Sequence, residues 1–342
     1  MATLKNAGNM DKNPLILADG RWVGTHGIGR FSHEVLSRLK NISILREGPP
    51  PLSIQNLFWQ PYYLYRHKNK YKLFFTPGFN PVSISTMPSI ITIADLIHLY
   101  GPEKQNVAKK AFYEFLIKPS LYRALKIFTV SEFSKRSIAE WGNIPSEKII
   151  NVGCGISASF YPDGEKHDPG YPYFLYVGNM KAHKNIPRLI HAFANADFDG
   201  KLILTGERSP LILEIIQKKH LENRIIFSKK LDEETLAKYY RGAMGLLFPS
   251  LYEGFGLPPL EAMACGTPVL ASNVTSIPEV VGNAVLLINP YEQDAITEGI
   301  NQLVHDDALR KSFLRLGLER AQVFSWDKTA GKIQEVLDEV VF

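Results

Sequence analysis

The sequence predicts an α/β protein with two domains, each built around a parallel sheet that is covered by helices. Apolar runs of strand length alternate with segments of helical periodicity along most of the chain. The length of 342 residues exceeds that of one ordinary domain. Residues 162–172 interrupt the alternation with a polar stretch of prolines and glycines. We therefore expect a linker there, between two doubly wound, Rossmann-like domains that face each other across a cleft.

The first domain is expected to span residues 1–165. Short continuous apolar runs are typical of parallel strands, which are buried on both faces. Such runs predict strands at residues 14–18, 73–75, 90–93 and 127–130, and helical periodicity predicts a helix at 28–39. Short helices are expected to fill the remaining gaps.

The same alternation predicts a second domain at residues 166–325. Strands are expected at 173–177, 201–204, 224–227, 245–248 and 269–271, with helices at 186–194, 232–242 and 258–264. Residues 326–342 are expected to form a C-terminal helix that packs back on the first domain.

The composition is that of a soluble globular protein, with 45% hydrophobic and 21% charged residues and a mean hydropathy of -0.09. The sequence has no run of about 18 apolar residues that could span a membrane. Residues 1–13 lack the pattern of a secretion signal. Cys154 and Cys265 are too few for a disulfide framework or a zinc site, which favours a reducing compartment. We expect a cytoplasmic protein, which could also lie on the cytoplasmic face of the membrane.

The charge is distributed unequally along the chain. Residues 1–160 contain 20 Lys and Arg against 10 Asp and Glu, whereas the remainder contains 19 against 24. A basic half favours an anionic partner. Cations gather at residues 66–72 and again at 104–126. In the second cluster they alternate with aromatic residues; its cations are Lys104, Lys109, Lys110, Lys118, Arg123 and Lys126. Such helices can lie on anionic lipid, and lysines solvated above an aromatic core are an equal alternative. Nucleic acid is not expected, because no motif that reads bases accompanies the charge.

Residues 249–269 carry the strongest indication of chemistry. An apolar strand ends at Phe248, a loop with two glycines follows, and Pro258 and Pro259 suit the first turn of a helix. The amides at such a helix start favour an anion, for which a diphosphate is the natural candidate. Glu253 and Glu261 flank this position and could accept hydrogen bonds from sugar hydroxyls. The segment therefore predicts a nucleotide-sugar site, although Glu261 alone could equally bond helix-start amides.

The motif Glu253-x7-Glu261, within Pro-Ser-x-Tyr-Glu-Gly-Phe-Gly-Leu-Pro-x-Leu-Glu-Ala-Met-Ala-x-Gly-Thr-Pro-Val, resembles the signature of glycosyltransferase family 4. The resemblance extends to residues 176–185, 130–134 and 27–30, and so covers most of the chain. It implies a GT-B fold and a retaining transferase without a bound metal. It also implies that Glu253 contacts the transferred sugar, Glu261 the ribose and Lys184 the diphosphate. Further donor-binding residues are then expected at Gly27, Gly29, Gly178, Asn179, Lys181, Gly254, Phe255, Gly256 and Leu257.

The chain departs from the family pattern at two positions. Where relatives often have an arginine five residues before the lysine, this chain has Asn179, and Lys181 or His183 could compensate. The histidine that often precedes Asp95 is absent. His98 could replace it, although a histidine in an apolar segment is more often packed. Asp95 and His98 therefore join Glu253 and Lys184 as catalytic candidates.

No metal or other cofactor is expected. Asp197 and Asp199 form an Asp-x-Asp sequence, but they precede a strand and would lie at its amino end, so we interpret them as a turn. Asp19 is more often a loop cap than a catalytic group.

Residues 19–22 with 27–30 resemble bacterial mannosyltransferases of lipopolysaccharide O-antigen assembly. This resemblance favours transfer of mannose from GDP-mannose to a lipid-linked oligosaccharide. A nucleotide-sugar epimerase of the same fold and a noncatalytic sugar- or lipid-binding paralogue are the alternatives.

Overall fold

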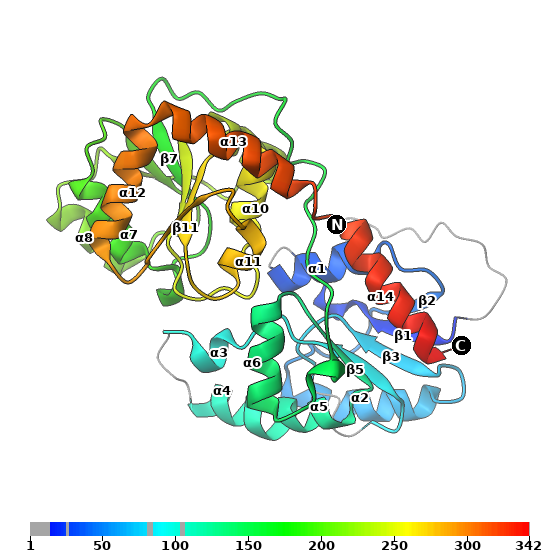
Figure 1. Ribbon diagram of the computed structural model, residues 1–342. Coiled ribbons are helices and arrows are strands. Elements are labelled where there is room, and N and C mark those ends of the chain that lie inside the picture. The colour runs from blue at the N-terminus through cyan, green and yellow to red at the C-terminus, as the bar shows by residue number, and fades with distance from the viewer. Residues whose placement is uncertain (1–13, 25–26, 81–84, 103–106, 342) are drawn as a thin grey trace. The chain divides into compact units, whose positions relative to one another are not determined.

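The computed structural model describes residues 14–24, 27–80, 85–102 and 107–341 (Figure 1). It divides into two compact units. The first comprises Met1–Leu99, Gln105–Gly155 and Ser325–Phe342, and the second comprises Tyr100–Lys104 and Ile156–Phe324. Each unit contains one six-stranded sheet, and every strand pair in it is parallel. The predicted fold class is confirmed.

The sheet of the first unit has the order β2-β1-β3-β4-β5-β6. Its strands are β1 (Ile16–Asp19), β2 (Ile42–Leu45), β3 (Leu73–Thr76), β4 (Ser89–Thr92), β5 (Lys126–Thr129) and β6 (Ile149–Asn151). Its helices are α1 (Gly27–Leu36), α2 (Ile54–His67), α3 (Ile97–Tyr100), α4 (Val107–Phe112), α5 (Lys118–Arg123), α6 (Glu132–Gly142) and α14 (Trp326–Val341). A π-helical turn, Tyr113–Ile117, joins α4 to α5.

The helices of this unit cover opposite faces of the sheet. One buried cluster joins strand residues to α2, the π-turn, α5 and α6 through Leu64, Tyr113, Leu121 and Ile138. On the other face α1 packs against α14, where the rings of Phe31 and Trp326 meet edge to face at 6.1 Å (Figure 1). Crossover connections between parallel strands carry helices to both faces of a sheet.

The sheet of the second unit has the order β12-β11-β10-β7-β8-β9. Its strands are β7 (Tyr173–Tyr176), β8 (Lys201–Leu204), β9 (Ile225–Phe227), β10 (Gly245–Phe248), β11 (Val269–Ser272) and β12 (Leu286–Ile288). Its helices are α7 (Ile186–Asn195), α8 (Pro210–Lys218), α9 (Glu233–Gly242), α10 (Leu257–Ala264), α11 (Ile277–Val281), α12 (Gln293–His305) and α13 (Asp307–Ala321). Helices α7, α8 and α12 share one core cluster, and α10 packs against α9, α11 and α13.

The segment expected to be a linker, residues 162–172, belongs to the second unit and packs on α9. The ring of His167 stacks on the ring of Tyr239, with 3.8 Å between the ring centres. The backbone N–H of His167 donates to the Lys238 carbonyl at 2.9 Å. Arg241 donates to the carbonyls of Tyr161 and Glu165. Prolines and glycines exclude regular structure here, but the polar groups of the segment still find partners. The expected linker position is therefore wrong: the chain leaves the first unit at Gly155 and enters the second at Ile156.

Candidate functional site

The topology of the second sheet marks one position for a ligand. The first strand of this unit, β7, lies beside the fourth, β10, and the chain winds away from this pair in both directions. In open α/β sheets ligands bind beyond the carboxyl ends of the strands at this switch point. Lys184 follows β7 and Glu253 follows β10. The expected donor residues of this unit therefore gather around one sheet position.

Lys184 and Glu253 form an ion pair. The Nζ atom of Lys184 lies 2.6 Å from Oε1 of Glu253, and the side chains are 11% and 13% exposed. The ammonium also lies 5.2 Å from the centre of the Phe248 ring. Charges removed from water require a partner of opposite sign. Each side chain therefore neutralises the other.

The loops that carry the pair are bound to each other. Asn185 adopts a left-handed backbone conformation, with φ of 62°, and its side-chain amide donates to the carbonyls of Pro249 and Pro290 at 3.0 and 2.8 Å. The Leu251 N–H donates to the His183 carbonyl at 2.7 Å. These bonds hold Lys184 and Glu253 in register across the switch point.

Two further residues position Glu253, and neither lies in a motif that the sequence reveals. Thr275 Oγ1 accepts a hydrogen bond from the Glu253 N–H at 3.2 Å, and Ser276 Oγ donates to the carbonyls of Glu253 and Phe255 at 2.9 and 3.1 Å. Thr275 has a φ of 59°, which is costly for a β-branched residue. Both residues follow a third parallel strand, β11. Because the carboxyl ends of parallel strands meet at one edge of a sheet, this position could have indicated that they lie near Glu253.

The start of α10 lies in the same loop. Gly256 caps the helix with φ of 107°, and a Cβ there would lie 2.5 Å from Cδ1 of Ile277. Pro258 and Pro259 lack N–H groups, so Leu257 and Leu260 carry the amide donors of the first turn. Glycine is thus required at residue 256 by both backbone conformation and space.

Glu261 lies on the buried side of α10. Its Oε2 atom accepts a hydrogen bond from the Tyr240 hydroxyl of α9 at 3.0 Å. A carboxylate has about four acceptor positions, and the Tyr240 hydroxyl occupies one of them.

The loop after β7 is compact. The Gly178 N–H donates to Thr205 Oγ1 at 3.1 Å. The Asn179 carbonyl accepts from the Tyr176 hydroxyl at 2.8 Å, and Asn179 Oδ1 accepts from the Lys181 N–H at 3.2 Å. Burial, and to a lesser degree the charge of Glu253, hold the pKa of Tyr176 well above its usual value. Lys181 is exposed and His183 is buried.

Four of the expected site residues belong to the first unit, whereas Lys184, Glu253 and Glu261 belong to the second. Gly27 begins α1, and a Cβ on Gly29 would lie 2.8 Å from the Gly24 backbone. The Oδ1 atom of Asp95 accepts from the Ile97 N–H at 3.0 Å at the start of α3. The ring of His98 meets that of Tyr113 at 6.1 Å.

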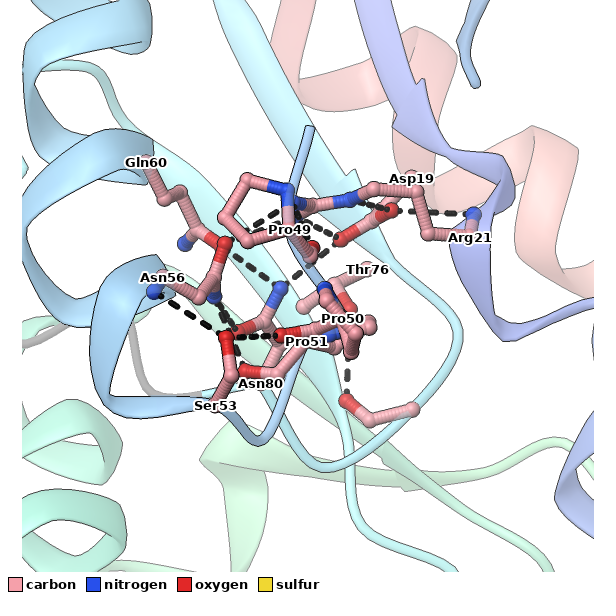
Figure 2. A network of polar contacts seen from close by, with 11 residues as sticks. Asp19, Arg21, Pro49, Pro50, Pro51, Ser53, Asn56, Gln60, Thr76 and Asn80 are labelled. Atoms are coloured by element: carbon pink, nitrogen blue, oxygen red, sulfur yellow. Dashed lines mark hydrogen bonds and ion pairs between the residues drawn. The ribbon is translucent and has the colours of Figure 1, made fainter. Parts of the chain in front are cut away.

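The first unit has its own switch point, between β1 and β3, and a polar network occupies it (Figure 2). The Arg21 guanidinium donates to both oxygens of Asp19 at 2.8 Å, and the Asn80 amide donates to Asp19 Oδ2 at 2.7 Å. Asp19 also caps the short helix Gly20–Trp22, as expected of a loop cap. Asn56 and Gln60 of α2 complete the network. Its polar groups bond mainly to each other.

The Asp-x-Asp sequence lies apart from the switch point. Asp197 is exposed, and its Oδ2 lies 3.1 Å from His305 Nε2. Across the described ranges, His, Cys, Asp and Glu side chains form no group of three or more that could hold a metal ion. Both cysteines are buried free thiols, and burial raises the pKa of Cys265 to about 12. Within the part of the chain that the structure describes, no helix combines the length and hydrophobicity needed to cross a membrane.

Comparisons with known proteins identify the family of the chain. Residues 159–317 match the family described as Glycosyl transferases group 1. The O-antigen chain mannosyltransferase B of Escherichia coli is 34% identical over 255 residues, which cover 70% of this chain and 67% of that protein. The O-antigen chain mannosyltransferase RfbU of Salmonella typhimurium is 32% identical over 62% of this chain and 60% of its own.

Solved structures share the fold. Sucrose-phosphate synthase from Thermosynechococcus elongatus has a TM-score of 0.75 at 22% identity, covering 95% of this chain and 98% of its own. The Anabaena protein HepE, solved with UDP and glucose, has a TM-score of 0.75 at 16% identity, covering 95% and 99%. Together with the sequence matches, these similarities show that the chain belongs to the Glycosyl transferases group 1 family and is a glycosyltransferase of the GT-B fold.

Proposed function

We propose that the protein transfers mannose from GDP-mannose to a hydroxyl of a lipid-linked oligosaccharide in O-antigen assembly, with retention and without a metal ion. The Lys184–Glu253 pair at the switch point is the observation that carries the donor site. The names of the two bacterial relatives support mannose and O-antigen. We also propose that the basic first unit holds the protein at an anionic membrane surface on the cytoplasmic side, where such an acceptor would be available.

In this proposal the donor diphosphate exchanges places with a carboxylate. The diphosphate approaches the Lys184 ammonium and the amides of residues 254–257, and Glu253 is released to accept hydrogen bonds from the sugar. Fixed dipoles and a cation stabilise the leaving diphosphate without reorganising during the reaction. Lys184 thus takes over part of the charge neutralisation that a metal ion supplies in other transferases.

The proposed reaction exchanges one bond at the anomeric carbon for another on the same face. The bond between the anomeric carbon and the phosphate oxygen breaks, and the acceptor oxygen forms the new glycosidic bond. The departing phosphate oxygen takes the acceptor proton, so the products are a glycoside and a nucleoside diphosphate. This route requires no protein nucleophile.

A panel of labelled nucleotide sugars tests the proposal. GDP-mannose, UDP-glucose, UDP-galactose and UDP-N-acetylglucosamine are each incubated with the protein and detergent-dispersed lipid-linked oligosaccharides. We expect label from GDP-mannose in the lipid fraction, and loss of that transfer in Lys184→Gln. Lys218→Gln is a matched control, because Lys218 forms an equally short pair with Glu214 on the exposed surface of α8. An epimerised nucleotide sugar without transfer, or binding without turnover, would indicate one of the alternatives instead.

A further inference from the structure

Helix α2 has its polar and apolar faces in an unusual orientation. Its exposed face carries four large apolar side chains, Ile54, Phe58, Tyr62 and Tyr65, which are 78%, 76%, 64% and 53% exposed. Spacings of four, four and three residues place them on one stripe of the helix. A helix of a globular protein normally turns such a stripe inward. We call these four residues the α2 stripe.

The opposite face of α2 is polar at two positions that are almost completely buried. Asn56 and Gln60 point into the network of Figure 2, where Arg21 Nη1 donates to Asn56 Oδ1 at 2.8 Å and Asn80 donates to Gln60 Oε1 at 2.6 Å. The ion pair of Arg21 with Asp19 anchors this network to β1. Turning α2 to bury its stripe would strand these buried polar groups, which is costly. The network therefore fixes the rotation of α2 with the stripe outward.

The segment that carries the stripe is basic, although the exposed Glu47 accepts a hydrogen bond from the Tyr63 hydroxyl of α2. Between Glu47 and Asp95 the sequence contains no acidic residue, whereas Arg66, Lys68, Lys70 and Lys72 follow at the end of α2 and are exposed. The Lys68 ammonium lies 4.2 Å from the centre of the Tyr65 ring. Aromatic residues with cations at their margin match the interface of an anionic bilayer, where rings reach the acyl boundary and ammonium groups meet headgroups.

The second basic cluster lies on the same face of the sheet (Figure 1). Of its aromatic residues, Tyr113 is buried in the core, whereas Phe115 and Tyr122 are exposed. Lys109, Lys110 and Arg123 are exposed, but Lys118 pairs with Glu114 at 3.4 Å, and Lys104 lies outside the described residues. Among the described cations of this cluster, Lys118 therefore already has an acidic partner.

We propose that the α2 stripe is the element that inserts the first unit into the interface of an anionic lipid bilayer, with the cations at residues 66–72 contacting headgroups. The inference deepens the proposed function, since it names the part of the chain that would meet the membrane of a lipid-linked acceptor. Insertion of apolar side chains adds a contribution that salt does not screen, whereas the cations contribute one that salt weakens.

Vesicle sedimentation without any nucleotide sugar tests this inference. Vesicles contain either phosphatidylcholine alone or a mixture with phosphatidylglycerol, at low and high salt. The double variant Phe58→Ser/Tyr62→Ser should lower partitioning into the anionic vesicles about 100-fold at both salt concentrations, because 1.4 kcal/mol of lost burial per ring is about tenfold each. Lys68→Gln/Lys70→Gln/Lys72→Gln should lower it mainly at low salt.

A matched control comes from the second unit. Leu211 and Tyr291 are 57% and 58% exposed, and Leu211→Ser/Tyr291→Ser should bind vesicles like the wild type. Unchanged circular dichroism and thermal melting confirm that each variant is folded. Wild-type protein that ignores anionic vesicles at low salt, or a stripe variant that binds like the wild type, overturns the inference. Analytical ultracentrifugation provides a further test. A wild-type protein that is a dimer, together with a stripe variant that is a monomer, would also overturn the inference, since the stripe would then bind a second copy of the chain.

The outcome is separable from that of the proposed function. Transfer to a short, water-soluble acceptor should be unchanged in the stripe variant, because no stripe residue is among the expected site residues of either unit. Failure of the nucleotide-sugar panel with intact vesicle binding would reject the proposed reaction and leave the inference standing.

Discussion

Replacing Glu253 by Gln removes one charge of the buried pair and leaves the Lys184 ammonium without a counter-ion. With an effective dielectric constant of about 20, two unit charges about 3 Å apart attract by about 5 kcal/mol. The pair is about a tenth exposed and Gln keeps a hydrogen-bond acceptor, so water and the amide offset part of this loss. We expect a loss of about 3 kcal/mol, the lower end for breaking a buried pair.

Urea denaturation can locate this loss in one unit. The tryptophans at 22, 59, 141 and 326 all belong to the first unit, so their fluorescence reports on that unit alone. Far-ultraviolet circular dichroism reports on both units. Glu253→Gln should shift the circular dichroism transition and leave the fluorescence transition in place. Glu214→Gln removes the acid of the exposed Lys218 pair, also 2.6 Å long, and should leave both transitions almost unchanged.

The same substitution, Glu253→Gln, should strengthen nucleotide binding although it lowers stability. In the proposed exchange the ion pair of the wild type breaks when a diphosphate contacts Lys184, whereas in Glu253→Gln the ammonium is already released. Calorimetry should therefore show GDP binding about tenfold tighter, a gain of about 1.4 kcal/mol, while sugar transfer falls. A variant that binds both GDP and UDP more weakly than the wild type, or one no less stable than Glu214→Gln, would refute the exchange of carboxylate for diphosphate.

Three other predictions concern Glu261, Asp197 and His167. Glu261→Ala should weaken GDP binding about tenfold or more, since it removes a carboxylate acceptor proposed for the ribose; unchanged affinity in calorimetry contradicts that role. Chelator and Asp197→Ala should both leave transfer rates intact, and an absolute need for Mg²⁺ or Mn²⁺ would reject metal independence. Burial lowers the pKa of His167 below its ordinary 6.5, with Asp168 opposing weakly. The unfolded chain then binds the proton more tightly, so stability should fall as pH drops through about 6.5. His167→Phe, which keeps a ring on Tyr239, should show a smaller difference between urea midpoints at pH 7.5 and 5.0.

Most strands were predictable because a parallel strand inside a sheet is buried on both faces, and its continuous apolar run is visible without knowledge of its neighbours. This holds for residues 73–76, 173–176 and 245–248. The strands β2, β6 and β12 were not predicted; they lie at sheet edges and are less completely buried. Helix α2 was not predicted as a long helix, because its exposed positions are apolar and two of its buried positions are polar. The partners that make Asn56 and Gln60 acceptable inside the protein come from the short helix after β1 and from the loop after β3.

Local motifs were enough to indicate the residues proposed for the donor site: the glutamates at 253 and 261, the lysine at 184 and the glycine at 256 that caps α10. Contacts between distant segments show the rest: Lys184 and Glu253 neutralise each other, Thr275 and Ser276 hold the Glu253 backbone, and residues 162–172 pack on α9. The physical reason is the distance along the chain. Backbone conformation and helix starts depend on adjacent residues, whereas a charge finds its partner only after crossovers bring the carboxyl ends of separate strands to one edge.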